Sequence, residues 1–518
     1  MKKKGLFSKI NMLTGVCMLS TTIFAQNAGE IDVTFGVNGY TYTDHVIGVH
    51  EMYKNIITLA DDKIVAVGYT SEANQNVILT KYDANGIPDL SFGNNGLAIY
   101  DLSIGGDEQA FSVKELYDGK MLVVGVIEGM TSNNGFLMRV EANGDLDLSF
   151  GTNGYVMFNA GANTFAVGFD LHVNQDNSIY VGASVLNANA NADFAIFKFT
   201  QGGGLDLTFA ASGSNVFDFG ADEILMSMDV DANGNIFLAG IKDDGPTTNG
   251  LLVKLNSYGL IENSFNGTGM IEYQNAMQDH YFNDVKAVGT NKVLVVGHEG
   301  TGADIDGILL MYNGDGTPDN TFSSDGKQVS DIGMSNGVYL HRVEVLYDGR
   351  ILTTGHVAGL SMFGMYALVL FDDGNPDFDF APGGDEIYGF PIQVDGVIME
   401  CMTLQSDNKI IVAGIVQSDD LPEVNLMMTR IHLEDAVGLS SEMKSSLIVY
   451  PNPTQTSFSI RSDEFIQNVK LSDLSGRIVQ QWDVNQQIYL FDQQLPDGNY
   501  ILTIQTENGT SVQKLMKH

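Results

Sequence analysis

Short apolar runs recur along this chain at an almost constant spacing. Each run belongs to an octet that ends at or near a glycine, and successive octets start 57 to 59 residues apart. A phenylalanine recurs with a similar spacing. The octets are residues 61–68, 118–125, 176–183, 233–240, 290–297, 348–355 and 407–414, and the phenylalanines are Phe35, Phe92, Phe150, Phe209, Phe265, Phe322 and Phe380. A fixed period of this length is typical of a propeller or another repeat array.

Each unit predicts four β-strands and no helix. In the second complete unit, residues 108–116, 120–127, 135–141 and 155–159 alternate in polarity or stay apolar over short stretches, which is strand behaviour. Seven such units predict an all-β fold, a seven-bladed β-propeller. A solenoid of stacked repeats is the rival, although solenoids need capping repeats at both ends.

The two ends of the repeat region favour a closed ring. The region opens at 32–43 with the phenylalanine and one strand, and it closes at 425–433 with a third strand. The strand missing from the last unit is therefore the one that precedes the first. We predict that this N-terminal strand closes the last blade, which removes an exposed sheet edge, and that the propeller spans residues 27–436.

The residues around the recurring phenylalanine resemble a known repeat. Residues 89–96 and 147–154 have the form Asp-x-Ser-Phe-Gly-x-x-Gly, which resembles the delta-60 repeat, a bacterial β-propeller repeat of uncharacterised function. The resemblance covers nearly all of 32–432, and the fourth to seventh copies depart from the pattern. It implies a fold and no activity.

The N-terminus predicts a secretory signal peptide over residues 1–25. It is basic at first, then mostly apolar, and Ala25 precedes a polar start. Cys17 raises a lipoprotein alternative, but Val16 is a poor fit to the small residue expected before it. After cleavage only Cys401 remains, so no internal disulfide can form. No later segment is long and apolar enough to predict a transmembrane span.

The chain is strongly acidic. Its formal charge is −38, and removal of the first 25 residues leaves 22 Lys and Arg against 64 Asp and Glu. A charge of this sign repels nucleic acid and anionic membranes, so nucleic acid is excluded as a partner. It also keeps a secreted protein soluble.

The C-terminus predicts a separate module. Residues 437–446 are small and polar and are predicted to be a linker. Residues 447–518 contain six short strands with turns between them, which predicts a small β-sandwich. Several motifs there resemble the type A C-terminal sorting domain of the type IX secretion system. The matching residues are Tyr450, Pro451, Asn452, Pro453, Gly476, Gly498, Tyr500 and Lys514.

That resemblance implies a route and a location. The type IX secretion machinery would be a partner, and the protein would be secreted or held on the outer cell surface of a Gram-negative bacterium. It implies nothing about the activity of the repeat region.

The motifs that could carry chemistry are weak. Residues 333–337 fit Gly-x-Ser-x-Gly, but a nucleophile elbow needs a strand before it and a helix after it, so we interpret them as a loop. His298 and His356 occupy equivalent positions in neighbouring units, and we interpret them as solvated loop residues rather than a metal pair. Acidic turns at 83–89, 141–147 and 313–319 fit ordinary turn chemistry, with calcium binding as the alternative.

No catalytic, cofactor-binding or metal-ligating residue can be assigned from these patterns. Sugar sites often stack on Trp, and the only Trp, Trp482, lies in the C-terminal module. A glycan site in the propeller would therefore depend on tyrosines such as Tyr69, Tyr281 or Tyr339.

The sequence favours non-catalytic binding of an extracellular protein or glycan. The loops between the second and third strands differ in every unit, and in a propeller they share one face with the loops between units. Such loops are either a recognition surface or simply unconstrained. The alternative function is a hydrolase or lyase with its site at the central cleft. A cluster of acids, His or Arg at the channel mouth favours that enzyme, and a channel of small apolar and scattered polar residues favours binding.

Overall fold

The computed structural model of the chain describes most of the two predicted domains. The described residues are 27–43, 50–70, 74–103, 106–129, 133–161, 164–187, 191–274, 278–302, 304–333, 336–359, 363–390, 396–417, 425–434, 448–450, 457–473, 477–492, 495–496, 498–506 and 510–517. The predicted signal peptide (1–25) and linker (437–446) lie outside them. The chain divides into two compact units, Met1–Ala436 and Val437–His518.

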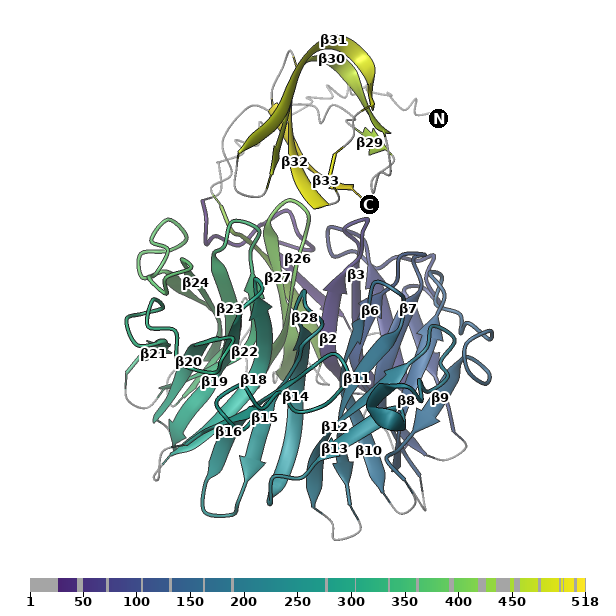
Figure 1. The fold of residues 1–518 in the computed structure, drawn as a ribbon, viewed down its shortest axis with the longest axis vertical. Helices are drawn as coiled ribbons and strands as arrows, with labels where there is room; N and C mark the ends of the chain where they lie inside the picture. The colour runs from purple at the N-terminus through teal and green to yellow at the C-terminus, as the bar shows by residue number, and fades with distance from the viewer. Residues whose placement is uncertain are drawn as a thin grey trace, which may run out of the picture. The chain divides into compact units, whose positions relative to one another are not determined.

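The described part of the first unit is all-β, with one short 3-10 turn, η1 (Phe209–Ala211). Its strands form seven four-stranded antiparallel sheets (Figure 1). The first three are β2 (Glu51–Thr58), β3 (Ile64–Thr70), β4 (Val77–Tyr82) and β5 (Leu97–Tyr100); β6 (Asp107–Glu115), β7 (Met121–Glu128), β8 (Asn133–Val140) and β9 (Tyr155–Phe158); and β10 (Phe165–Val173), β11 (Ile179–Leu186), β12 (Ala192–Phe199) and β13 (Ser214–Phe217).

The other four sheets repeat the pattern. They are β14 (Asp222–Val230), β15 (Ile236–Asp243), β16 (Thr248–Leu255) and β17 (Met270–Tyr273); β18 (Asp279–Val288), β19 (Lys292–Thr301), β20 (Asp304–Asn313) and β21 (Lys327–Ser330); β22 (Asn336–Val345), β23 (Ile351–Gly359), β24 (Phe363–Leu370) and β25 (Asp385–Tyr388); and β26 (Gly396–Leu404), β27 (Lys409–Gln417), β28 (Asn425–His432) and β1 (Tyr40–Thr43).

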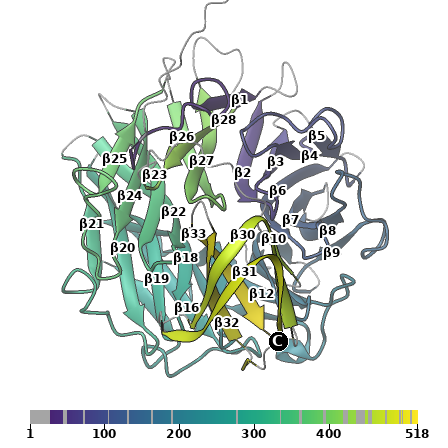
Figure 2. The same ribbon diagram turned by 90° about the horizontal axis from the view of Figure 1, so that it is seen from above.

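The sheets are arranged around a common axis, with their first strands toward the centre (Figure 2). Each first strand contacts the first strand of the next sheet, in the order β2, β6, β10, β14, β18, β22 and β26, and β26 contacts β2. Side chains between neighbouring sheets form the core as a series of buried apolar clusters. This arrangement is propeller-like, as the repeat predicted.

The sheet of the last unit contains a strand from the start of the chain. β1 pairs antiparallel with β28, with Tyr40 opposite Thr429 and Thr43 opposite Leu426. The segment before β1 is held by charge as well. Asp32 is almost fully buried and accepts a hydrogen bond from Arg430 Nε at 2.9 Å, and the same carboxylate oxygen forms an ion pair with Arg430 Nη2 at 2.8 Å.

The recurring Asp-x-Ser/Thr-Phe motif forms a turn that joins one unit to the next. In the second complete unit, Asp147 accepts hydrogen bonds from the backbone N–H and hydroxyl of Ser149, which fixes the turn locally. Phe150 then packs against Gly203 of the following unit, where any Cβ atom would overlap the ring. The next residue, Gly151, donates its N–H to the carbonyl of Gly202 at 3.1 Å.

All seven recurring phenylalanines are buried, as expected for side chains that pack between neighbouring units. Replacement of Phe150 by Ala is therefore expected to lower the free energy of unfolding by about 3–5 kcal/mol, because it leaves a cavity that the turn cannot fill. Urea denaturation measures the loss. The matched control is Leu148→Ala in the same connection, where the side chain is 72% exposed and little change is expected. Equal losses in the free energy of unfolding for both variants would contradict the packing of Phe150 between units.

The described strands of the second unit form one connected sheet. They are β29 (Ile448–Tyr450), β30 (Ser457–Asp473), β31 (Ile478–Asp492), β32 (Gly498–Thr506) and β33 (Thr510–Lys517), in the order β29-β30-β32-β33 with β31 on β30. The prediction of six short strands was wrong, because four of the predicted strands merge into two long ones. Two pairs of predicted strands are continuous in β30 and β31, because no Gly or Pro interrupts 457–473 or 478–492 and the shifts of register are absorbed as bulges.

The residues assigned to the sorting motif are spread over this unit. Tyr450 ends β29, Gly498 begins β32, and Lys514 lies in β33 opposite Ile501. The Tyr500 hydroxyl donates to the carbonyl of Pro496 at 2.8 Å. Pro451, Asn452, Pro453 and Gly476 lie outside the described residues. In the described part of the chain, no helix has the length and apolar character needed to cross a membrane.

Candidate functional site at the ring axis

Each first strand contains a β-bulge at the ring axis. In β6, Ala110 pairs with Gly125 and Ser112 pairs with Val124, so Phe111 is an extra residue without a partner. A Cβ atom at Gly125 would overlap the carbonyl oxygen of Gln109. The glycine that ends the octet therefore makes room for the bulge. A bulge changes the direction in which a side chain points, and here the extra residue of each bulge lines the axis of the ring.

The bulge residue of each unit lines one cavity of about 310 Å³. We call these seven side chains the bulge layer. They are Lys54, Phe111, Phe169, Met226, Asn283, His341 and Glu400. In the sequence, each lies 14 residues before the last residue of its octet.

The bulge layer has an apolar half and a polar half. Phe111, Phe169 and Met226 come from three consecutive units, and the two rings lie 5.2 Å apart. The other half contains Asn283, His341 and an ion pair between Lys54 Nζ and Glu400 Oε2 at 2.9 Å. An apolar wall opposite a few polar groups is typical of a small-ligand site.

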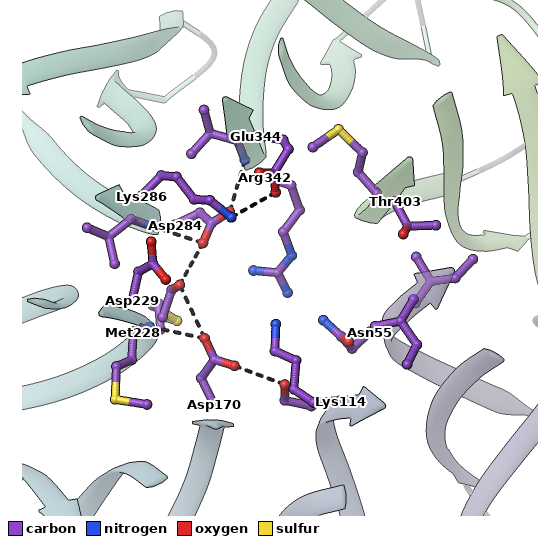
Figure 3. Close-up of a pocket in the computed structure, with 18 of the residues that line it drawn as sticks. Asn55, Lys114, Asp170, Met228, Asp229, Asp284, Lys286, Arg342, Glu344 and Thr403 are labelled. Atoms are coloured by element: carbon purple, nitrogen blue, oxygen red, sulfur yellow. Dashed lines mark hydrogen bonds and ion pairs between the residues drawn. The ribbon is translucent and has the colours of Figure 1, made fainter. Parts of the chain in front are cut away.

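A second cavity of about 320 Å³ adjoins the first and shares Phe111, Phe169, Met226 and Arg342 with it (Figure 3). Its lining is strongly charged. The charged residues are Lys114, Asp170, Asp229, Asp284, Lys286, Arg342 and Glu344. Arg342 extends into the middle of this cavity (Figure 3), so its guanidinium is accessible to a ligand in either cavity.

Three of these carboxylates hold neighbouring units together. Asp170 accepts the N–H of Met228 at 3.1 Å, and Asp284 accepts the N–H of Val343 at 2.9 Å. Asp229 accepts the N–H of Ala287 at 2.8 Å. Each bond joins one unit to the next at the axis. These acids therefore have a structural role that requires no ligand.

Arg342 and Asp284 are the central charged pair. Burial raises the pKa of Asp284, and Arg342 and two hydrogen-bond donors offset part of that rise. Burial opposes the charge of Arg342, but Asp284 and other nearby acids raise its pKa overall. The Arg342 Nε atom is buried and has no hydrogen-bond partner within the described ranges. Because Arg342 also lines both cavities, an anionic group of a ligand can pair with the part of the guanidinium that faces them.

Lys286, another charged residue of the channel, is also paired. Lys286 lies 2.9 Å from Glu344, and although burial opposes its charge, Glu344 and Asp229 raise its pKa. Cys401 of β26 is fully buried in the apolar cluster between the last and first sheets, which raises the pKa of its thiol to about 12. A thiol with that pKa is a poor nucleophile.

The prediction that His298 and His356 are solvated loop residues was wrong. They lie within β19 and β23, where Tyr281 stacks on His298 at 4.6 Å and Tyr339 stacks on His356 at 4.9 Å. Burial lowers the pKa of each histidine to about 4. The sequence did not reveal this because the octet strand continues past its glycine.

His341 of the bulge layer connects to this cluster. Its Nε2 lies 3.0 Å from Nδ1 of His356, so one of the two nitrogens donates a hydrogen bond. Burial lowers the pKa of His341 well below its usual range, and His356 and His298 lower it further. The three rings are therefore neutral at physiological pH.

The other predicted sites lie away from the axis. In the acidic turn at 83–89, Asp83 accepts the N–H groups of Asn85 and Ile87, which is turn chemistry. In the turn at 313–319, Asp315 bonds Thr317 in the same way. At 333–337 the strand β22 begins at Asn336, so a strand follows the serine position instead of a helix. Met334 and Ser335 lie outside the described residues.

Sequence reasoning missed the bulge layer altogether. Its seven members belong to six residue types, so they do not appear as a repeated residue. The signal that could have found them is their fixed distance from the octets, because variation at one register of a repeat marks a position freed from packing.

The loops between the second and third strands lie beside the starts of the next first strands. Gln75 of such a loop accepts the N–H of Glu108 at 2.9 Å, and its own N–H is donated to Asp107 at 2.8 Å. This end of the unit carries the loops whose sequences vary, and the bulge layer lies nearer to it than the charged cavity does, because the bulge residues come earlier in each first strand.

Two family models match parts of the chain. One is described as a secretion system C-terminal sorting domain and matches residues 448–518. The other is described as a domain of unknown function (DUF5122) beta-propeller and matches residues 59–92 and 118–150. The comparison with curated proteins found no match.

Several solved structures are similar at low identity. A protein of unknown function from Dyadobacter fermentans is 12% identical, with 76% of this chain and 98% of that chain covered and a TM-score of 0.40. PorZ, a surface component of the type IX secretion system of Porphyromonas gingivalis, is 11% identical over 95% and 86%, with a TM-score of 0.27. A Trypanosoma rangeli sialidase is 9% identical over 92% and 89%, with a TM-score of 0.40. At these TM-scores none of the likenesses carries an argument about function.

The chain is therefore a β-propeller-repeat protein. Its C-terminal domain is a type IX secretion sorting domain, so the protein is secreted or displayed on the cell surface of a Bacteroidetes-type Gram-negative bacterium.

Proposed function

We propose that the seven sheets are the blades of one closed propeller, in which β1 completes the blade of β26, β27 and β28. The pairing of β1 with β28 and the contact of β26 with β2 support closure. The boundary between compact units at Ala436 and Val437 supports the division into a signal peptide (1–25), the propeller (27–436), a linker (437–446) and the sorting domain (447–518).

In the sorting domain, the residues that the secretion machinery recognises are those of the matching motifs. Tyr450 and Lys514 both lie in strands of this unit. The adjacent Pro-Asn-Pro and the turn glycines complete the set of Pro451, Asn452, Pro453, Gly476, Gly498 and Tyr500.

The exported propeller binds an extracellular ligand without chemical change, and the ligand is a glycan or a protein segment that enters the channel at the bulge layer. The observation that carries this proposal is the two-sided bulge layer. Phe111 and Phe169 offer a face for stacking, although the ring has no Trp, and Asn283 and the Lys54–Glu400 pair offer hydrogen bonds. Arg342, which lines both cavities, would receive an acidic group of the ligand.

Binding is preferred over catalysis because the channel acids are already engaged. The acids and Arg342 that line the second cavity form the kind of charged cluster that would favour an enzyme. However, Asp170, Asp229 and Asp284 each accept a backbone N–H from the next unit. A general acid or base must reach the substrate, and these oxygens are committed to holding the ring.

The proposal is tested with a glycan and surface-protein array probed with the purified full chain. For a ligand found in this way, Phe111→Ala and Arg342→Gln are each expected to weaken binding about tenfold or more, which corresponds to about 1.4 kcal/mol or more. The matched control is Tyr347→Ala in an exposed turn between first and second strands, which is expected to bind normally. If the unchanged protein and the three variants bind with equal affinity, the ligand does not bind at the bulge layer.

The alternative is a hydrolase or lyase that uses His341 as a base. The observation in its favour is that His341 lies in the same cavity as Arg342 and hydrogen-bonds to His356. The full chain is incubated with the ligand, and new reducing ends or unsaturated products are measured. Product that disappears in His341→Ala while binding is retained would establish the enzyme, and stable ligand supports binding alone.

A further inference from the structure

Three carboxyl side chains gather at the junction between the third and fourth sheets. Asp193 is the second residue of β12, Asp218 follows β13, and Glu223 is the second residue of β14. One oxygen from each lies within 4.8 Å of the others. The cluster is separate from the channel and lies at the end of the ring that carries the variable loops.

One oxygen of this cluster has no partner. Asp193 is only 3% exposed, and its Oδ2 accepts a hydrogen bond from Asn187 at 3.1 Å. Its Oδ1 is buried without a hydrogen bond from any described residue. Glu223 is fully buried, and its oxygens accept the N–H groups of Phe219 and Ala221. A buried carboxylate oxygen without a donor is costly, which makes this oxygen a candidate ligand for a cation.

The negative charge of the cluster is also uncompensated. Among the residues that the structure describes, no Lys or Arg forms an ion pair with Asp193, Asp218 or Glu223. Burial raises the pKa of Glu223 to about 7, and the neighbouring acids add to the rise. Burial and nearby acids also raise the pKa of Asp193. A bound cation would satisfy the oxygen and the charge together.

The repeat supplies an internal comparison. Strand pairing defines the three positions. Asp193 is the residue before Phe194, which pairs with Phe217, and Asp218 is the residue after Phe217. Glu223 lies two residues before Leu225, the last paired residue of β14 ahead of its bulge. Four other junctions can be aligned by the same registers. They carry Asn76, Asp101 and Glu108; Asn134, Asn159 and Ala166; Asn249, Gln274 and His280; and Asp306, Asp331 and Val338. Of these five junctions, three carboxylates occur together only at the third, whereas a buried polar atom without a hydrogen-bond partner also occurs at the first (Glu108 Oε2) and the fourth (Asn249 Oδ1 and His280 Nδ1).

We propose that Asp193, Asp218 and Glu223 bind one Ca²⁺ ion. All the ligands are oxygens, which suits a hard cation, and zinc would favour His or Cys. Calcium accepts irregular oxygen sets at bonds of about 2.3–2.6 Å, so oxygens up to 4.8 Å apart can share one ion. The ion would join β12 to β14 across the junction and stiffen the variable end of the ring.

Calorimetric titration of the full chain with CaCl₂, after removal of metals with EDTA, tests the site. We expect binding in the range of extracellular calcium modules, about 0.1–1 mM, and a higher melting temperature with calcium. Asp218→Asn is expected to weaken binding at least tenfold. Because Asp218 is exposed, this variant is expected to fold, and its melting temperature without calcium should equal that of the unchanged protein. Asp193→Asn should have the same effect on affinity.

Asp331→Asn is the matched control. Asp331 holds the position of Asp218 at the fifth junction, where Val338 replaces the third carboxylate, and its loss should leave calcium binding unchanged. No calcium binding by the unchanged protein, or equal binding by Asp218→Asn, would overturn the proposal. Tighter binding of MgCl₂ or ZnCl₂ than of CaCl₂ in parallel titrations would overturn the choice of ion.

Discussion

Removal of residues 27–44 is expected to lower the melting temperature and solubility of the propeller far more than removal of an exposed loop segment of equal length. The deletion removes β1, which pairs with β28 over four residues. It also removes the bond between Gly29 N–H and the carbonyl of His432 at 2.8 Å. The edge of β28 is then unpaired, and exposed edges promote aggregation. A trimmed protein that melts like the intact one means that the ring is open, and the solenoid interpretation returns.

Asp32→Asn tests the same closure without a deletion. The Asp32 carboxylate is buried with Arg430, and Lys409 lies 3.1 Å away. Loss of one partner of a buried pair costs about 3–5 kcal/mol, so a large fall in the free energy of unfolding at pH 7 is expected. Asp118→Asn, at an exposed turn between a first and a second strand, is the control.

The difference in the free energy of unfolding between Asp32→Asn and the unchanged protein should depend on pH. Burial opposes the charge of Asp32, but Thr34 and Arg430 hold its pKa well below 3.8. A carboxyl with a lowered pKa stabilises the fold above its unfolded pKa, and this contribution is lost as the pH falls through the folded value. Denaturation curves of the two proteins should therefore approach each other below about pH 4.

Removal of residues 447–518 is expected to abolish appearance of the protein outside the cell and to leave a folded propeller in the periplasm. The sorting domain matches 448–518 and belongs to a separate compact unit. Because the closing contacts lie within 27–434, the ring does not need this domain to fold.

Immunoblots of the medium, cell surface and periplasm measure the distribution. The truncated chain should melt at the temperature of the intact propeller transition, which separates a sorting defect from misfolding. Leu148→Ala in the complete chain serves as the export control. Normal amounts of the truncated protein in the medium contradict the assigned role of residues 447–518.

The parts of the fold that could be predicted are those that repeat. In six of the seven octets the glycine recurs because the bulge places a carbonyl oxygen over it; the exception is the third octet, which ends at Ala183. Phe150 and its equivalents recur because each fills the same space between units. The same packing constraint applies to every copy, so the recurring glycines and phenylalanines are visible in a single sequence. The strands of the second complete unit were placed within two residues of their observed ends.

The candidate site could not be predicted for the opposite reason. His341 and Phe111 occupy one register but share no chemistry, so nothing in the sequence connects them until the ring brings them together. The bulge also breaks the alternation by which inward positions are recognised. The carboxylate cluster was hidden in another way, because Asp193 and Glu223 belong to different sheets and meet only at a junction.

The pairing of β1 with β28 also governs the order of assembly. Gly39 and Thr429, which are joined by a hydrogen bond, lie 390 residues apart in the sequence. At synthesis rates of about 5–20 residues per second, the first strand made waits roughly 20–80 s for its partner. Every other sheet can form from contiguous residues in the meantime. The earliest segment of the ring is thus the last to be paired, and closure is expected to be the slow phase of refolding.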